Sequence, residues 1–174
     1  LRGVMPQDKI NEHYLYVDRI LKKLSNTFNK EVKVCIHPAY DIKKHQKNLP
    51  DFEVIQFRTR ELIYKAFLVT LFDSSAIIDA VLLKKNIIGL TSDIMGLNGA
   101  KQSQAYSNVI GYLNLNTKNE IEEKKKLLNI MKNNIKNYNN YINDHISFDS
   151  KKSGLDRIID EIKERYFNKR FKTI

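Results

Sequence analysis

The chain has 174 residues, of which 42% are hydrophobic and 29% are charged, a composition typical of a folded protein rather than a disordered one, and its length suits one domain. Its single cysteine excludes an internal disulfide, and no apolar run approaches the roughly 20 residues that a membrane-spanning helix needs. The 30 Lys and Arg residues against 20 Asp and Glu residues leave a net charge of +10. This charge is compatible with nucleic acid, an anionic membrane or a phosphorylated substrate, and lysine-asparagine tracts of the kind an AT-rich genome encodes also explain it.

The chain begins with a predicted helix and a predicted strand. Apolar residues spaced by three and four positions predict the helix over 10–28, and a β-branched alternation predicts the strand over 32–36. The strand is expected to end at His37-Pro38, because proline has no N–H to donate to a central ladder.

The next elements alternate between strands and helices. In chain order they are a strand over 53–57, a helix over 59–65 capped by Thr59, a strand over 66–72, a helix opened by Asp73-Ser74-Ser75 that runs through Leu82, and a strand over 86–90. The run over 66–72 is apolar throughout, which is typical of a strand covered on both faces in the middle of a parallel sheet. The alternation indicates βαβ units, so the predicted fold class is α/β, with a Rossmann-like parallel sheet flanked by helices.

The second half of the chain is less regular. Residues 91–107 include Gly96, Gly99 and several polar residues and are expected to form a mobile loop. The remaining predicted elements are a strand over 109–115, a helix over 121–142, a joining segment over 143–153 and a closing helix around 155–166. The chain is therefore expected to form a single Rossmann-like domain over 1–174 with a helical C-terminus.

Two polar clusters follow predicted strands and are the candidate site. Ligands of parallel α/β folds bind beyond the carboxyl ends of the strands, where His37-Pro38 and Asp73-Ser74-Ser75 are expected to lie. Serines at the start of a helix offer hydroxyls and backbone N–H groups to a phosphate without any metal, and a histidine can donate to the same phosphate or carry a proton. Two structural alternatives stay open: a serine that only caps the helix, and a histidine that only ends a strand.

These residues carry a resemblance to a known family. The run Val34-Cys35-Ile36-His37-Pro38, followed by Asp73-Ser74-Ser75-Ala76-Ile77-Ile78-Asp79-Ala80 and Lys85-Asn86-Ile87-Ile88-Gly89-Leu90, resembles the C-terminal, nucleotide-binding half of certain GT-B glycosyltransferases. These are the bacterial sialyltransferases and polysialyltransferases that carry an HP motif and an S or SS motif, with their relatives among capsule and teichoic acid polymerases. The resemblance covers about residues 14–90.

The resemblance implies roles for the two clusters. His37, Ser74 and Ser75 would contact the phosphate and nucleotide of the donor, so the predicted donor-binding residues are His37, Pro38, Asp73, Ser74 and Ser75, with His37 also catalytic. Many relatives place a cation soon after the HP pair, whereas Ala39-Tyr40-Asp41 precedes Lys43 and Lys44 here. The acceptor-binding half of such enzymes, which commonly provides the catalytic base, is not contained in 174 residues, so the chain is expected to be a C-terminal fragment.

The expected function is that of the donor-binding domain of a metal-independent glycosyltransferase that builds a surface polysaccharide, capsule or lipooligosaccharide. Its expected substrate is a nucleotide-sugar donor, CMP- or UDP-linked, with no separate cofactor and no metal, and its partner is a saccharide acceptor held by an N-terminal domain. The expected location is cytoplasmic, with peripheral association with the inner face of the membrane left open and no nucleic acid expected, because arginine clusters with interleaved aromatics are missing. Two alternatives are a nucleotide-sugar epimerase and a non-catalytic basic module that binds membrane or nucleic acid.

Cysteine, aspartate and histidine residues elsewhere in the chain are further candidates for chemistry. Cys35 is expected to be a small buried hydrophobe, and Asp79 to solvate its helix. Asp93 is a candidate for the border of the donor site. His13, His45 and His145 show no metal-ligand spacing with the single cysteine, so no metal site is predicted.

Overall fold

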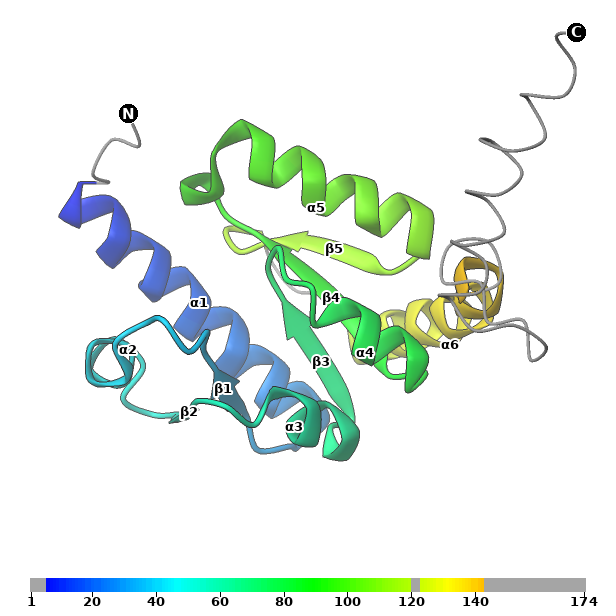
Figure 1. The fold of residues 1–174 in the computed structure, drawn as a ribbon, viewed down its shortest axis with the longest axis horizontal. Helices are drawn as coiled ribbons and strands as arrows, with labels where there is room; N and C mark the ends of the chain where they lie inside the picture. The colour runs from blue at the N-terminus through cyan, green and yellow to red at the C-terminus, as the bar shows by residue number, and fades with distance from the viewer. Residues whose placement is uncertain (1–5, 120–122, 143–174) are drawn as a thin grey trace, which may run out of the picture. The chain divides into compact units, whose positions relative to one another are not determined.

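The computed structural model describes residues 6–119 and 123–142, so the predicted joining segment over 143–153 and closing helix around 155–166 lie outside the described residues. The chain divides into two compact units, residues 1–138 and 139–174, and every described strand lies in the first. That first unit has parallel strands alternating with helices, a Rossmann-like α/β fold, and the described chain ends in a helical segment (Figure 1).

The strands form two parallel sheets. The first pairs β1 (Lys33–Cys35) with β2 (Glu53–Ile55), and the second has the order β3-β4-β5, with bounds Leu68–Leu71, Asn86–Thr91 and Leu113–Asn116. The helices are α1 (Gln7–Phe28), α2 (Ile42–Asn48), α3 (Thr59–Lys65), α4 (Ile77–Leu82), α5 (Gly96–Ile110) and α6 (Lys124–Tyr141), with a short 3₁₀ turn η1 (Asp93–Met95). Each strand predicted in the first half of the chain is present.

The long helix α1 covers both sheets. Its predicted apolar face is confirmed, and its buried side chains are Val17, Ile20, Leu21, Leu24 and Phe28. This face shares one core with Ile88 and Leu90 of β4, and Val34 of β1 and Leu68 of β3 pack against the same core. Burial of side chains this large, at roughly 1.5–3 kcal/mol each, makes α1 the element that joins the two sheets.

The central strand of the larger sheet is β4, not the strand predicted over 66–72. Strand β3 lies at the edge of its sheet and its four residues are only half-buried, whereas Ile87 and Ile88 of β4 are fully buried. An apolar run does not distinguish an edge strand that packs against a helix from a central strand, because both bury large side chains.

Residues 91–107 are not a mobile loop: they end β4, form η1 and contribute most of the helix α5. The buried face of α5 includes Ser103 and Ser107, which hydrogen-bond to the following turn and strand. The Ser107 hydroxyl donates to the Tyr112 carbonyl (3.0 Å), and the Asn114 amide donates to the Ser103 hydroxyl (3.2 Å). Because these inward positions are polar, the segment lacks the apolar periodicity that announces a helix.

The strand predicted over 109–115 begins later, at Leu113. Ile110 is the last residue of α5, and Gly111 takes the left-handed conformation (φ +83°) that ends many helices. Its N–H donates to the Ser107 carbonyl at 2.8 Å.

The inward face of α6 also mixes apolar and polar residues. The helix predicted over 121–142 is present as α6, and its buried residues are Leu127, Met131, Asn134 and Tyr138. Within residues 6–119 and 123–142, no helix combines the length and apolar character that crossing a bilayer requires.

Candidate functional site

The first predicted cluster lies in a turn directly after β1, which we call the HP corner (residues 37–40). The Ala39 N–H donates to His37 Nδ1 (3.1 Å) and the Tyr40 N–H donates to the His37 carbonyl (2.9 Å). With Nδ1 accepting, the neutral imidazole carries its proton on Nε2, and the side chain is exposed. His37 therefore offers one oriented donor at the carboxyl end of β1.

A side chain that directly follows the neighbouring strand holds the HP corner. Gln56, which follows β2, donates from Nε2 to the Tyr40 carbonyl (2.7 Å) and also lies 3.4 Å from the His37 carbonyl. On the far side of the corner, the Asp41 carboxylate caps α2 by accepting from the Lys43 N–H at 2.8 Å.

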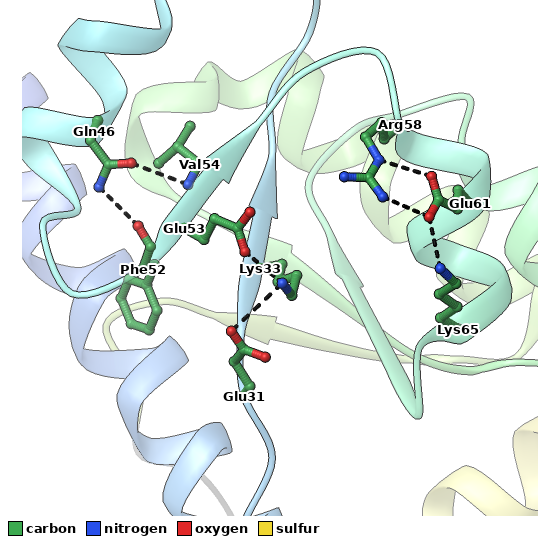
Figure 2. Close-up of polar contacts among 9 residues, drawn as sticks. All are labelled: Glu31, Lys33, Gln46, Phe52, Glu53, Val54, Arg58, Glu61 and Lys65. Atoms are coloured by element: carbon green, nitrogen blue, oxygen red, sulfur yellow. Dashed lines mark hydrogen bonds and ion pairs between the residues drawn. The ribbon is translucent and has the colours of Figure 1, made fainter.

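Helix α2 is in turn attached to β2. Figure 2 shows the Gln46 side chain between Phe52 and Val54: its Nε2 donates to the Phe52 carbonyl (2.9 Å) and its Oε1 accepts from the Val54 N–H (3.2 Å). The HP corner and the helix α2 that follows it are thus both attached to β2 or to the residue directly after it. The corner is therefore in place before a ligand binds.

The second predicted cluster follows β3, and we call residues 73–76 the serine corner. Asp73, Ser74 and Ser75 are all exposed. The Ser74 hydroxyl accepts from the Ala76 N–H (3.3 Å), and helix α4 begins only at Ile77. The N-cap of that helix is Ala76 and it has no side-chain cap, so Ser74 acts in the turn that leads into the helix. Because the Ser74 hydroxyl accepts there, its proton stays available to an external acceptor.

A series of edge-on and tilted rings runs from the end of β3 to the HP corner through α1 and α2. Successive ring centroids are 5.4–5.7 Å apart in the order Phe72, His13, Tyr14, His45, Tyr40 and His37. The Tyr14 hydroxyl and His45 Nδ1 also share a hydrogen bond of 2.8 Å. The two corners are therefore linked through the first turns of α1, although within the described residues no hydrogen bond joins His37 directly to Ser74 or Ser75.

The carboxyl ends of β4 and β5 meet the same part of α1. His13 Nδ1 and the Ser92 hydroxyl, which follows β4, are 2.8 Å apart. Arg19 Nη2 donates to the carbonyls of Thr117 (3.0 Å) and Lys118 (2.9 Å), which follow β5. The ends of three successive parallel strands thus converge on α1.

A shallow pocket of about 240 Å³ lies at this convergence. One wall comes from α1 and the other from the segments that follow β4 and β5. The polar and aromatic side chains that line the pocket include Glu12, His13, Tyr16, Ser92, Asp93 and Lys118. Lys118 pairs with Asp93 (2.7 Å) and Glu12 (3.4 Å). Asp93 was a candidate from the sequence, whereas His13, Ser92 and Lys118 were not, because nothing local marks residues that meet only in the fold.

The titratable groups of this region have shifted pKa values with clear causes. Burial lowers the pKa of both His13 and His45, and burial raises the pKa of the Tyr14 hydroxyl. The hydrogen bond between Lys118 and Asp93 raises the pKa of the lysine and lowers that of the aspartate.

The remaining candidates have structural partners. Asp79 pairs with Arg60 at 3.3 Å, and this ion pair links α4 to α3. Cys35 is half-buried, and its Sγ lies 3.1 Å from Thr59 Oγ1. Thr59 is the first residue of α3 and not its cap, contrary to the prediction, because the N-cap position is Arg58 and no side chain caps the helix. No group of three or more His, Cys, Asp or Glu side chains in the described part of the chain is arranged to hold a metal ion.

Comparison of the chain with models of protein families, with curated proteins and with solved structures finds no match. The likeness to GT-B glycosyltransferases therefore stays a resemblance of short motifs, and the fold class is what the structure establishes.

Proposed function

We propose that this chain is the donor-binding domain of a metal-independent glycosyltransferase, and that the HP corner and the serine corner hold the phosphate of a nucleotide sugar. The observation that carries the proposal is the orientation of His37. Its Nδ1 is occupied by the Ala39 N–H, so Nε2–H is presented to solvent at the carboxyl end of a parallel strand. A fixed donor at that edge is suited to an anionic ligand.

The topology supports the same position. In the view of Figure 1, β2 is drawn on one side of β1, and β3, β4 and β5 on the other. Parallel α/β folds bind ligands beyond the carboxyl ends of their strands. The two corners follow β1 and β3, one strand from each of the two parallel sheets.

The chemistry assigned to this domain is stabilisation of a leaving group. A hydroxyl of the acceptor saccharide attacks the anomeric carbon, the bond from that carbon to the phosphate oxygen breaks, and a base outside this site takes the hydroxyl proton. Negative charge grows on the departing phosphate, where His37 Nε2–H and the hydroxyls of Ser74 and Ser75 would donate to it. Fixed donors stabilise such charge better than water, which must reorganise.

The partners follow from this chemistry. The acceptor would be a surface saccharide, capsule or lipooligosaccharide, bound by a further domain, and the donor would be a CMP- or UDP-linked sugar. Pro38 and Asp73 belong to the two corners, but their side chains have no hydrogen-bond donor to offer a phosphate.

Titration calorimetry with CMP, CDP, UMP and UDP tests the proposal. We expect at least one of these nucleotides to bind, and we expect His37→Ala and the double variant Ser74→Ala with Ser75→Ala to lose that binding while keeping the circular dichroism spectrum of the parent. All three side chains are exposed, so their truncation leaves the core unchanged. Unchanged nucleotide affinity in these folded variants would show that the two corners do not form the binding site.

A further inference from the structure

Phe57 is an exposed aromatic residue in a strained backbone conformation. It follows β2 by two residues, its side chain is 77% exposed, and its φ is +61°, in the left-handed region that bulky residues rarely adopt. Such conformations persist where the surrounding structure enforces them, and they concentrate at ligand-binding sites.

The neighbours of Phe57 place it at the HP corner. Gln56 hydrogen-bonds to the Tyr40 carbonyl at 2.7 Å, so the backbone of the next residue emerges beside residues 37–40. Arg58 is engaged elsewhere: its Nε and Nη2 reach Glu61 at 2.8 and 2.7 Å, and Lys65 joins the same carboxylate, as Figure 2 shows. The guanidinium next in sequence is therefore paired along α3, and the Phe57 ring stays exposed.

A second exposed ring lies in the corner itself. Tyr40 is 60% exposed, and its ring centroid lies 5.7 Å from that of His37 and 5.7 Å from that of His45. The tyrosine ring is thus in tilted contact with two imidazoles. Two exposed aromatic side chains thus come from the two segments that Gln56 joins, the HP corner and the end of β2.

We infer that Phe57 and Tyr40 form the platform on which the nucleobase of the donor stacks. This inference rests on the proposed function, because the ligand that brings a base to this corner is the nucleotide whose phosphate His37 holds. Stacking suits the site, since every base has a π-face and a flat ring needs no hydrogen-bonding partner to bind it. Phe57 and Tyr40 are accordingly binding residues and take no part in the transfer step.

The absence of tryptophan from the sequence allows a direct test. Phe57→Trp introduces one tryptophan, and a base that stacks on it quenches its fluorescence. We expect CMP or UMP to quench this variant in a saturable manner and ribose 5-phosphate, which lacks a base, to leave its fluorescence unchanged. The matched control is Tyr64→Trp, since Tyr64 is a similarly exposed ring (67%) on α3, and no quenching is expected there.

Affinity measurements complete the test. Glycine adopts φ +61° without strain, so Phe57→Gly is expected to fold, to bind the nucleotide between about 5-fold and about 150-fold more weakly, and to keep the parent affinity for ribose 5-phosphate. Phe57→Tyr keeps a ring and is expected to keep the parent affinity for both ligands.

The outcomes separate the inference from the proposed function. If the parent protein binds no nucleotide, both are wrong. If it binds nucleotide through His37 but Phe57→Gly binds equally well and Phe57→Trp is not quenched, the stacking platform is wrong and the proposed function stands. An equal loss of nucleotide and ribose 5-phosphate in Phe57→Gly would also overturn the platform, because the effect would then lie in the corner and not in contact with the base.

Discussion

His13 Nδ1 and Ser92 Oγ lie 2.8 Å apart, although the two residues are 79 positions apart in the chain. This hydrogen bond attaches the first half of α1 to the carboxyl end of β4, at the edge where the candidate site lies. Ser92 is buried, and burial also lowers the pKa of His13, so the contact is shielded from competing water.

Removing this contact should destabilise the protein. Ser92→Ala leaves a ring nitrogen of His13 without its partner, and we expect a loss of about 1 kcal/mol in the free energy of unfolding. Urea titration followed by circular dichroism measures it. Ser75→Ala is the control, because Ser75 is exposed, and its expected change is below about 0.5 kcal/mol. Equal stabilities for Ser92→Ala and the parent would show that the hydrogen bond contributes nothing.

Stability should fall on mild acidification because of two histidines. Burial lowers the pKa of His13 and, together with the Lys44 charge, that of His45, each below its ordinary value of 6.5. The unfolded chain therefore binds more protons than the folded one as the pH drops through 6.5. The stabilisation is fully present above that pH and is lost as the pH falls toward the folded pKa.

Urea midpoints at pH 7.5 and pH 5.5 measure this effect. The parent is expected to have the lower midpoint at pH 5.5, and the double variant His13→Gln with His45→Gln is expected to show a smaller difference between the two pH values. The same pH dependence in both proteins would assign the effect to other groups.

Gly89 should be intolerant of any side chain. It lies in the central strand β4, and an added Cβ would come within 2.5 Å of Tyr112 Cε2 and 2.9 Å of Asn114 Oδ1. Tyr112 is itself buried and cannot move away, so we expect Gly89→Ala to cost about 1–3 kcal/mol. The unfolding free energy from urea titration checks this value.

A substitution at Gly96 tests backbone strain alone, whereas a substitution at Gly89 tests crowding by neighbouring side chains. A Cβ there meets nothing within 4 Å, but its φ of +67° and ψ of 173° belong to a region that is almost confined to glycine. Gly96→Ala should therefore also destabilise. In a Tyr112→Leu background, the cost of Gly89→Ala should shrink while the cost of Gly96→Ala stays the same. A constant cost at both positions would contradict crowding at Gly89.

Gln56 should act on the proposed site without touching the ligand. Gln56→Met removes the donor to the Tyr40 carbonyl and frees residues 37–40, and we expect nucleotide affinity to fall by about fivefold, the equivalent of one hydrogen bond. Calorimetry measures the affinity, and Gln104→Met, on the exposed face of α5, is the control with no expected change. An unchanged affinity in Gln56→Met would show that the corner keeps its shape without this side chain.

Much of the fold could be predicted from local patterns. The spacing of apolar residues in α1 and the β-branched run of β1 each report directly on burial, and both elements lie where they were expected. Helix α5 could not be predicted, because Ser103 and Ser107 fill its inner face and satisfy their hydrogen bonds only through β5 and the turn before it. Which of β3 and β4 is the central strand likewise depends on the pairing between strands, and the sequence of one strand does not specify this pairing.

The candidate site was predictable in part for the same reason. His37-Pro38 and Asp73-Ser74-Ser75 are marked by their positions after apolar strands, and the structure places each of them after a parallel strand. The pocket residues Ser92 and Lys118 carry no such mark, because their partners on α1 lie far away in the chain.

The most direct measurement is a crystal structure of the protein with the nucleotide that calorimetry selects. We predict that the phosphate lies between the two corners, with its oxygens within hydrogen-bond distance of His37 Nε2 and of the hydroxyl of Ser74 or Ser75. A phosphate bound at Lys118 in the pocket beside α1, or one that touches only one corner, would contradict the account.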